Sequence, residues 1–185
     1  MSKLKKLFLI FLFLLGISVV SYSKQHYKII FEHLMAVEGE KTVRAEDGYS
    51  KFGLTKYYVE KPQNLTRVQA YEIIYQDVYK KYNLHKIKRL SVKHLCLDYI
   101  FNTNPYKAVR EIKKLCKRYN PNINPKSMEI DDRTLKVLNS NPFIYNDILV
   151  NRMNYIRSLK KYKKYGKGWE KRLDFFKKEY EYEFF

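Results

Sequence analysis

Apolar residues recur at helical spacing near the start of the chain. Ile30, Leu34 and Val37 lie at positions i, i+4 and i+7, which predicts an amphipathic helix. Glycine is often the first residue past the end of a helix, so Gly39 predicts that this helix ends at or beside Glu38.

Similar spacing predicts further helices along the rest of the chain. They are expected in LTRVQAYEIIYQDVYKKY, where Thr66 and Gln69 form a capping box, and in SVKHLCLDYIF, YKAVREIKKLCKR, RTLKVLN and PFIYNDILVNRMNYIRSLKKYKKY. The segment GKGWEKRL is expected to turn the chain into a final helix. YSKFGLTKYYVE, rich in aromatic and β-branched residues, is predicted to form a short hairpin. The expected fold is mainly α with a small β-hairpin near its N-terminal end.

The first 23 residues differ in character from the rest. A basic stretch, MSKLKK, precedes fourteen uncharged residues, LFLIFLFLLGISVV, and Ser21 and Ser23 have the small-x-small spacing of a cleavage site. These features predict a signal peptide and export to the periplasm, the cell envelope or the medium. An uncleaved membrane anchor is the alternative, since this apolar stretch is short for a membrane span but could tilt or thin the bilayer.

The chain is strongly basic, with a net charge of +18. Loss of residues 1–23 removes three lysines and leaves a charge of +15. Such a charge predicts a polyanionic partner, which for an exported protein is an anionic lipid surface or the cell wall. Nucleic acid is not expected, because no zinc-finger, RRM or KH signature accompanies the lysines.

Nothing in the spacing of the histidines or cysteines indicates a metal site. No histidine pair has the i, i+4 spacing with a nearby carboxylate that a helical zinc site would show, and the sequence contains no G-x-S-x-G elbow or glycine-rich phosphate loop. We therefore expect neither a metal nor a cofactor. Cys96 and Cys116 suit either a disulfide, which export would permit, or buried free thiols on two facing helices.

Glycines and carboxylates are concentrated in one short stretch, VEGEKTVRAEDGYSKFGLT. Glu38, at the end of a mainly apolar helix, is placed where a half-buried carboxyl group could act as a general acid. Asp47 could face it across a loop, and two carboxyl groups flanking a scissile bond are what glycoside hydrolysis requires. Spacing alone favours a simpler interpretation, in which Glu38 caps or solvates the helix end and the other acids pair with lysines.

Several motifs, in order, resemble those of glycoside hydrolase family 108, the lysozyme-like N-acetylmuramidases. The EG pair at Glu38 and the GYSKFGLT stretch resemble the family's E-G-G-Y … G-G-x-T-x-x-G-I-T signature. LTRVQAYEIIYQDVY and LDYIFNTN are similar to its next two segments. RMNYIRSLKKYKKYGKGWEKR resembles the end of the family's peptidoglycan-binding-like helical region. The resemblance covers nearly all of the chain after the predicted signal peptide.

The resemblance implies a lysozyme-like fold and hydrolysis of peptidoglycan glycan strands, with Glu38 as proton donor to the glycosidic oxygen. Asp47 is the first candidate for the second catalytic group, and Glu46 is the next. The candidate substrate-binding residues are Tyr49, Ser50, Phe52, Thr55 and Asn102. Anionic cell-wall polymers are expected to attract the basic surface, and we expect the protein to act as a monomer.

The resemblance also divides the chain. Residues 1–23 are expected to be the signal peptide, residues 24–118 a lysozyme-like catalytic region, and residues 119–185 a peptidoglycan-binding-like helical region packed on it. Two other functions stay open: a lytic transglycosylase, which also needs one acid but forms an anhydro sugar, and a non-catalytic cationic protein that binds the wall or assists secretion. The second is suggested by Glu40 and Asp47, which stand where the family has glycine.

Overall fold

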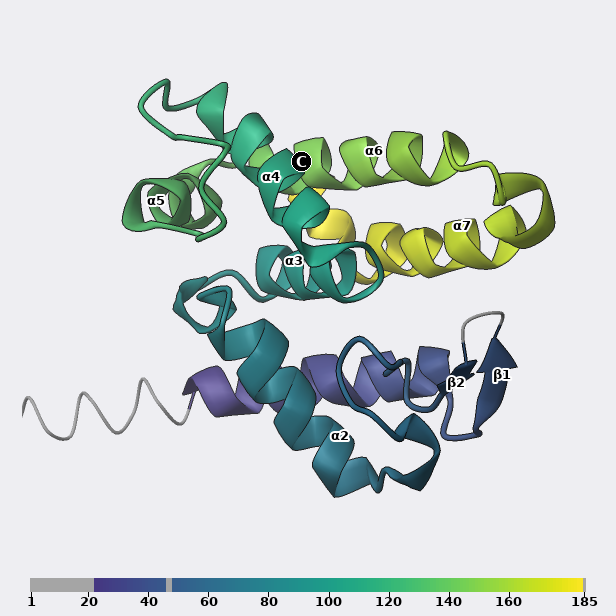
Figure 1. The fold of residues 1–185 in the computed structure, drawn as a ribbon. Helices are drawn as coiled ribbons and strands as arrows, with labels where there is room; N and C mark the ends of the chain where they lie inside the picture. The colour runs from purple at the N-terminus through teal and green to yellow at the C-terminus, as the bar shows by residue number, and fades with distance from the viewer. Residues whose placement is uncertain (1–21, 46–47, 185) are drawn as a thin grey trace, which may run out of the picture.

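The computed structural model describes residues 22–45 and 48–184 and is mainly helical (Figure 1). An N-terminal helix, described over residues 22–38, precedes the other elements. These are β1 (Val43–Ala45), β2 (Gly48–Ser50), η1 (Pro62–Asn64), α2 (Arg67–Ile74), η2 (Tyr75–Lys80), η3 (Leu84–Lys86), α3 (Leu90–Phe101), α4 (Pro105–Lys117), α5 (Asp132–Ser140), α6 (Ile144–Arg157), α7 (Tyr162–Glu179) and η4 (Glu181–Phe184). The predicted fold class, mainly α with a small hairpin, is confirmed.

The N-terminal helix ends at the predicted place. Gly39 follows its last residue with φ +73°, and the Gly39 N–H donates to the carbonyl of Met35 at 2.9 Å, which is the hydrogen bond of an αL C-cap. The buried stripe of this helix consists of Tyr27, Ile30, Phe31, Leu34 and Met35. The predicted face included Val37, but Val37 is exposed, and the stripe continues to the half-buried Glu38 instead.

The hairpin lies earlier in the sequence than predicted. β1 pairs with β2 in an antiparallel ladder that joins Val43 to Ser50, so only the end of this ladder falls in YSKFGLTKYYVE. That segment forms a second tight turn, with a bridge between Lys51 and Leu54. Phe52 and Gly53 both have positive φ, as a two-residue type I′ turn requires. The chain leaves this turn after one bridge, so the ladder does not extend.

Helix α3 lies between the N-terminal helix with α2 on one side and helices α4 and α6 on the other, and α7 lies beside α3, between the N-terminal helix and α6 (Figure 1). All of its residues after Leu90 are buried, which confirms the burial predicted from its apolar run. His94 contacts His33 of the N-terminal helix at 2.9 Å, and Tyr99 donates to Asn151 of α6 at 3.0 Å. One hydrophobic core therefore extends from the N-terminal helix to α7.

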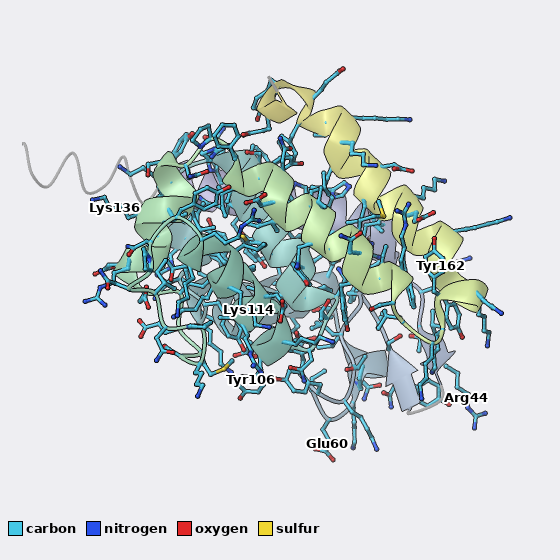
Figure 2. All side chains as sticks on the ribbon, turned by 90° about the horizontal axis from the view of Figure 1, so that it is seen from above. Arg44, Glu60, Tyr106, Lys114, Lys136 and Tyr162 are labelled. Carbon is cyan, nitrogen blue, oxygen red and sulfur yellow. The ribbon has the colours of Figure 1, made fainter. Side chains whose placement is uncertain are left out.

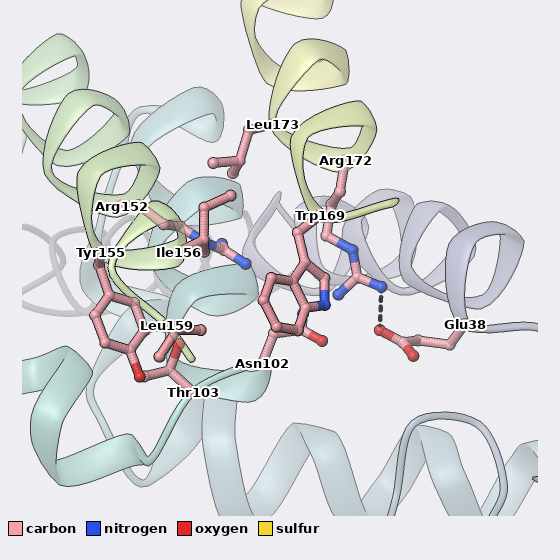
Figure 3. Close-up of a pocket in the computed structure, with 10 residues that line it drawn as sticks. All are labelled: Glu38, Asn102, Thr103, Arg152, Tyr155, Ile156, Leu159, Trp169, Arg172 and Leu173. Atoms are coloured by element: carbon pink, nitrogen blue, oxygen red, sulfur yellow. Dashed lines mark ion pairs between the residues drawn. The ribbon is translucent and has the colours of Figure 1, made fainter. Parts of the chain in front are cut away.

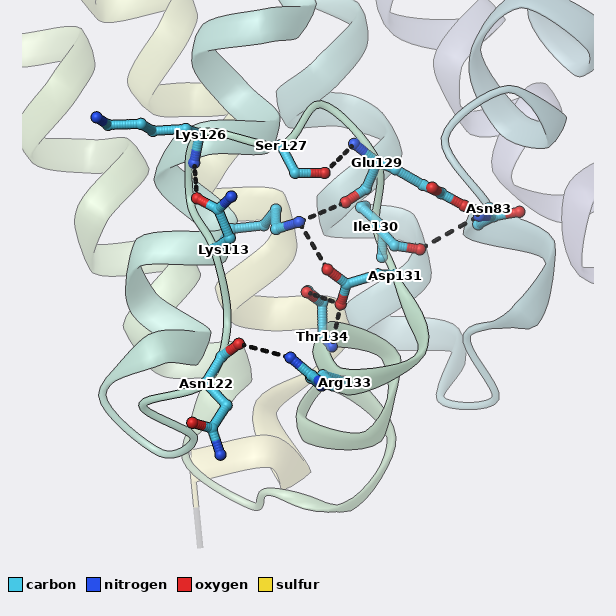
Figure 4. A network of polar contacts seen from close by, with 11 residues as sticks. Asn83, Lys113, Asn122, Lys126, Ser127, Glu129, Ile130, Asp131, Arg133 and Thr134 are labelled. Atoms are coloured by element: carbon cyan, nitrogen blue, oxygen red, sulfur yellow. Dashed lines mark hydrogen bonds and ion pairs between the residues drawn. The ribbon is translucent and has the colours of Figure 1, made fainter.

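A polar network stabilises the loop between α4 and α5 (Figure 4). The buried Lys113 ammonium donates to the carbonyl of Glu129 at 2.7 Å and to Asp131 at 2.9 Å. Asp131 in turn caps α5 by accepting from the Thr134 N–H at 2.9 Å. Burial alone would raise the pKa of Asp131, but the Lys113 ammonium and the Thr134 hydrogen bonds together lower it.

The boundary between the last two helices, α6 and α7, differs from the prediction. The sequence placed the break at Gly166 and Gly168, whereas α6 ends at Arg157 and α7 runs from Tyr162 through both glycines. Gly166 is needed for close packing, because a Cβ atom there would lie 2.6 Å from the Tyr162 ring. The glycine therefore accommodates an aromatic ring inside a helix rather than ending the helix.

Most of the charge is on the outside. Arg44, Glu60 and Lys136 are exposed and point away from the ribbon (Figure 2). Cys96 on α3 and Cys116 on α4 are buried free thiols, and burial raises the pKa of Cys116 to about 12. Within the described part of the chain, every helix is too short or too polar to cross a membrane.

Candidate active site

A cavity of about 240 Å³ lies where the N-terminal helix ends, between α3, α6 and α7 (Figure 3). The residues that line it with polar or aromatic groups include Glu38, Asn102, Arg152, Tyr155, Trp169 and Arg172. These residues come from the N-terminal helix, the end of α3, and the consecutive helices α6 and α7. The cavity therefore depends on the packing of α6 and α7 against the N-terminal part of the chain.

Two local features place the Glu38 carboxyl group in this cavity. Glu38 continues the buried stripe of its helix, so its side chain points inward and is only 16% exposed. Gly53, in the turn of the GYSKFGLT motif, lies directly beside it, since an added Cβ there would be 3.0 Å from both Cγ and Cδ of Glu38. The positive φ of Gly53 and this close approach both require glycine.

Arg172 of α7 forms an ion pair with Glu38. Its Nη2 atom lies 2.7 Å from Oε1 of Glu38, and the Arg172 side chain is 15% exposed (Figure 3). The pair lacks the alignment of a hydrogen bond at Oε1. Trp169, Arg172 and Leu173 are spaced i, i+3 and i+4 on α7, so they share the helix face that lines the cavity.

Asp98 of α3 links the two arginines of the site. It forms a close ion pair with Nη1 of Arg152, and its Oδ1 atom lies 3.8 Å from Nη1 of Arg172. The Asn102 amide donates to Oδ1 of Asp98 at 3.0 Å. Glu38, Arg172, Asp98 and Arg152 thus form a chain of alternating charge, in which two carboxylates balance two guanidinium groups.

Two histidines lie near the arginines of the site. His33 contacts His94 at 2.9 Å and stacks on Phe175 with ring centroids 3.6 Å apart. Burial and the charge of Arg172 lower the pKa of His33 to about 4. Burial, with His33 and Arg152, lowers the pKa of His94 well below its ordinary value. Both rings are therefore neutral at pH 7 and add no charge to the site.

The structure brings some of the predicted site residues together. Glu38 and Asn102 line the same cavity. Tyr49 on β2 is 45% exposed, Ser50 ends that strand, Phe52 is buried in the core, and the Thr55 hydroxyl accepts from the Tyr57 N–H at 3.3 Å. None of these four residues lines the cavity. Glu46 and Asp47 lie outside the described residues.

The sequence did not single out Asp98, Arg152, Trp169 or Arg172, although they complete the site around Glu38. All four occur in two of the stretches that resemble the glycoside hydrolase family, LDYIFNTN and RMNYIRSLKKYKKYGKGWEKR. That resemblance was a usable signal, but it did not say which side chains meet. Among residues 22–45 and 48–184, no group of three or more His, Cys, Asp and Glu side chains is arranged to hold a metal ion.

The arrangement can hold a sugar and offer it an acidic group. Trp169 and Tyr155 are partly buried and present ring surface to the cavity, while the two arginines and Asn102 supply hydrogen-bond donors. Glu38 is the carboxyl group on the cavity wall, whereas Asp98 is 3% exposed and held by its partners. Of the two carboxyl groups, Glu38 is therefore the one that a ligand can reach.

No protein-family model and no curated protein matches this sequence. Among solved structures, the chain is similar to SagA of Brucella abortus, with a TM-score of 0.71 and 19% sequence identity. The similarity covers 84% of this chain and 94% of that one. At this level of identity, the comparison shows that the two chains share a fold.

Proposed function

We propose that this protein is an exported peptidoglycan hydrolase, an N-acetylmuramidase that cleaves the glycan strand with Glu38 as general acid. The observation that carries the proposal is the position of Glu38, half-buried at the end of a helix and on the wall of a cavity that also contains Trp169 and Tyr155. The contact between Gly53 and Glu38 adds support, because it joins the two parts of the motif that resembles family 108.

In glycoside hydrolysis, one carboxylic acid protonates the leaving oxygen, while a second carboxylate activates water or stabilises the oxocarbenium-like transition state. Glu38 is our candidate for the first role. Asp98 is linked to Glu38 through Arg172, but it is buried and engaged by Arg152 and Asn102, so we assign it a positioning role. Asp47 remains the candidate for the second catalytic group.

The ion pair between Arg172 and Glu38 sets a condition on this mechanism. A general acid must lie within hydrogen-bond reach of the oxygen that it protonates, and Nη2 of Arg172 already lies 2.7 Å from Oε1 of Glu38. Proton donation by Glu38 therefore requires that Arg172 first moves away from it.

A wall-digestion assay with a Glu38→Gln variant tests the proposal. The wild-type protein should release fragments from purified peptidoglycan, and loss of a general acid should slow release by about 10²–10⁴-fold. Glu40→Gln is a matched control, since Glu40 has the same charge, is 57% exposed and pairs with Arg67 outside the cavity. If the Glu38 variant digests the wall at the wild-type rate, Glu38 is not the acid. Anhydro sugars in the product would identify a lytic transglycosylase instead.

The Arg172 contact also favours a second candidate function, a non-catalytic protein that binds wall glycan. In that case the ion pair with Glu38 would be permanent, and the cavity would only hold a sugar. A wild-type protein that sediments with peptidoglycan but releases no fragments would support this function and contradict the hydrolase.

We include export in the proposal, with a mature chain of charge +15 that is drawn to anionic wall polymers. Ser23, the last residue of the predicted signal peptide, contributes to packing, because its carbonyl accepts a hydrogen bond from the Tyr79 hydroxyl at 3.0 Å. Cleavage after Ser23 would remove this contact, whereas cleavage further upstream would keep it. The N-terminal sequence of the protein recovered from the envelope or the medium would locate the cut.

A further inference from the structure

The two ion pairs of the site differ in how firmly they are held. The Asp98 and Arg152 side chains are each 4% exposed, and the Arg152 guanidinium also lies 5.3 Å from the centre of the Tyr99 ring. Arg172 and Glu38 are 15% and 16% exposed, so both are several times more accessible than the first pair. Arg152 is therefore fixed by the core, while Arg172 can exchange its partner at the cavity wall.

Helices α6 and α7 present the same pair of groups to the cavity. Tyr155 is three residues after Arg152 on α6, and Trp169 is three residues before Arg172 on α7, so each helix places an aromatic ring beside a guanidinium group (Figure 3). An aromatic ring offers an apolar surface for a sugar ring, and arginine pairs with carboxylates through two parallel donors. The combination fits a sugar that carries a carboxylate.

The size of the cavity limits the ligand that it can hold. The volume of about 240 Å³ lies below the range of roughly 300–1,000 Å³ for drug-sized ligands, so the cavity suits a single sugar unit.

We propose that this cavity is a subsite for one acidic sugar unit, whose ring lies against Trp169 and Tyr155 and whose carboxylate pairs with Arg172 in place of Glu38. The lactyl ether of N-acetylmuramic acid carries a carboxylate of this kind. This inference rests on the proposed function for its choice of glycan.

The exchange of partners would couple recognition to catalysis. When a ligand carboxylate pairs with Arg172, the guanidinium group no longer occupies Oε1 of Glu38. A general acid must lie within hydrogen-bond reach of the oxygen that it protonates. An acidic sugar would therefore free Glu38 to contact the glycosidic oxygen, and a neutral sugar would leave the ion pair intact.

Two disaccharides test the subsite directly. N-acetylglucosaminyl-N-acetylmuramic acid and N,N′-diacetylchitobiose share their ring framework, and only the first carries the lactyl carboxylate. Trp169 is the one tryptophan of the chain, so its emission reports ligand in the cavity, and calorimetry supplies the affinities. We expect the wild-type protein to bind the acidic disaccharide at least about tenfold more tightly, and we expect the ratio of affinities to fall to about one in Arg172→Met.

Arg157→Met is the matched control. It removes the same charge from α6, but Arg157 is 56% exposed and pairs with Glu170 rather than with a residue of the cavity. This variant should keep the preference of the wild-type protein. Thermal melts of both variants confirm folding, and the comparison of the two sugars on the wild-type protein is informative even if Arg172→Met does not fold.

The inference is overturned if the wild-type protein binds neither disaccharide, binds both with the same affinity, or keeps its preference in a folded Arg172→Met variant. These outcomes differ from a failure of the proposed function. A protein that prefers the acidic disaccharide but never releases wall fragments would contradict the hydrolase and leave the subsite standing. A protein that digests the wall with no preference would do the reverse.

Discussion

Gly53 packs directly against the side chain of Glu38, so that a methyl group on Gly53 would lie 3.0 Å from Cγ and Cδ of Glu38 and 2.7 Å from Cε1 of Phe101. Gly53→Ala is therefore expected to displace the Glu38 carboxyl group and to lower the free energy of unfolding by about 1–3 kcal/mol. Wall digestion should fall with it. Chemical denaturation and fragment release measure the two effects.

Gly39→Ala separates backbone strain from this contact. Gly39 has φ +73°, close to that of Gly53, but nothing lies within 4 Å of a Cβ placed there. This variant should lose stability through its backbone, by about 1–2 kcal/mol, and should keep the Glu38 carboxyl group in place. Equal digestion rates for the two glycine variants would show that the contact with Gly53 does not position Glu38.

Two glycines inside α7 should respond in opposite ways to alanine. Gly168 has open space around its Cα, so Gly168→Ala should stabilise the helix by about 0.5–1 kcal/mol. Gly166→Ala should gain nothing or lose stability, because the added Cβ would lie 2.6 Å from the Tyr162 ring, and the Tyr162 hydroxyl donates to Glu170 at 2.6 Å. Similar rises in melting temperature for both variants would contradict the packing described for Gly166.

Acid should destabilise the protein through the partly buried His33. The pKa of His33 falls from 6.5 to about 4 in the folded protein, so the unfolded chain takes up a proton below pH 6.5 that the folded protein does not. Stability is therefore unaffected by His33 above pH 6.5 and decreases as the pH falls from 6.5 to about 4, with a loss of about 1–2 kcal/mol at pH 5. His33→Gln should reduce this loss. Melting temperatures at pH 7, 6 and 5 test the slope, and an unchanged slope in the variant would exclude His33 as a contributor.

Lys113→Met should cost more stability than the same change at the next residue. Lys113 is fully buried and donates to both Glu129 and Asp131, whereas Lys114 is 46% exposed and pairs with Glu111. Loss of hydrogen bonds to a charged group is expected to cost about 1.5–3 kcal/mol at Lys113, and loss of a surface pair at most about 1 kcal/mol at Lys114. Denaturant titration of the two variants measures the difference, and equal losses would contradict the role assigned to the network.

Local rules in the sequence predicted the elements that depend on neighbouring residues. The helix end at Glu38 followed from Gly39, and the start of α2 followed from the capping box of Thr66 and Gln69, which the structure contains. The hairpin lies earlier in the sequence than predicted, because the sequence did not reveal that Phe52 and Gly53 turn the chain after a single bridge. The two predictions that rest on residues three or four positions apart were confirmed, whereas the predicted position of the hairpin was wrong.

The rest of the candidate site depends on contacts between distant residues. Arg172, which meets Glu38, lies on α7, and this helix includes the glycines that the sequence assigned to a turn. Tyr162 packs over Gly166 and removes the usual reason for a break there. Asp98 lay in an apolar run and in a stretch that resembles the family, but its pairing with Arg152 depends on how α3 packs against α6.

Because α3 is buried on all sides, the N-terminal helix and the helices that follow α3 both need it as a packing partner. His94 of this helix contacts His33 of the N-terminal helix, and Asp98 pairs with Arg152 of α6. A cut in the loop between α4 and α5 would leave one fragment whose α3 is no longer covered by α6, and another fragment whose α6 has lost α3 as a packing partner. Such fragments should behave as a complementing pair, in which the sugar cavity forms only on reassembly, with Glu38 from one fragment and Arg172 from the other.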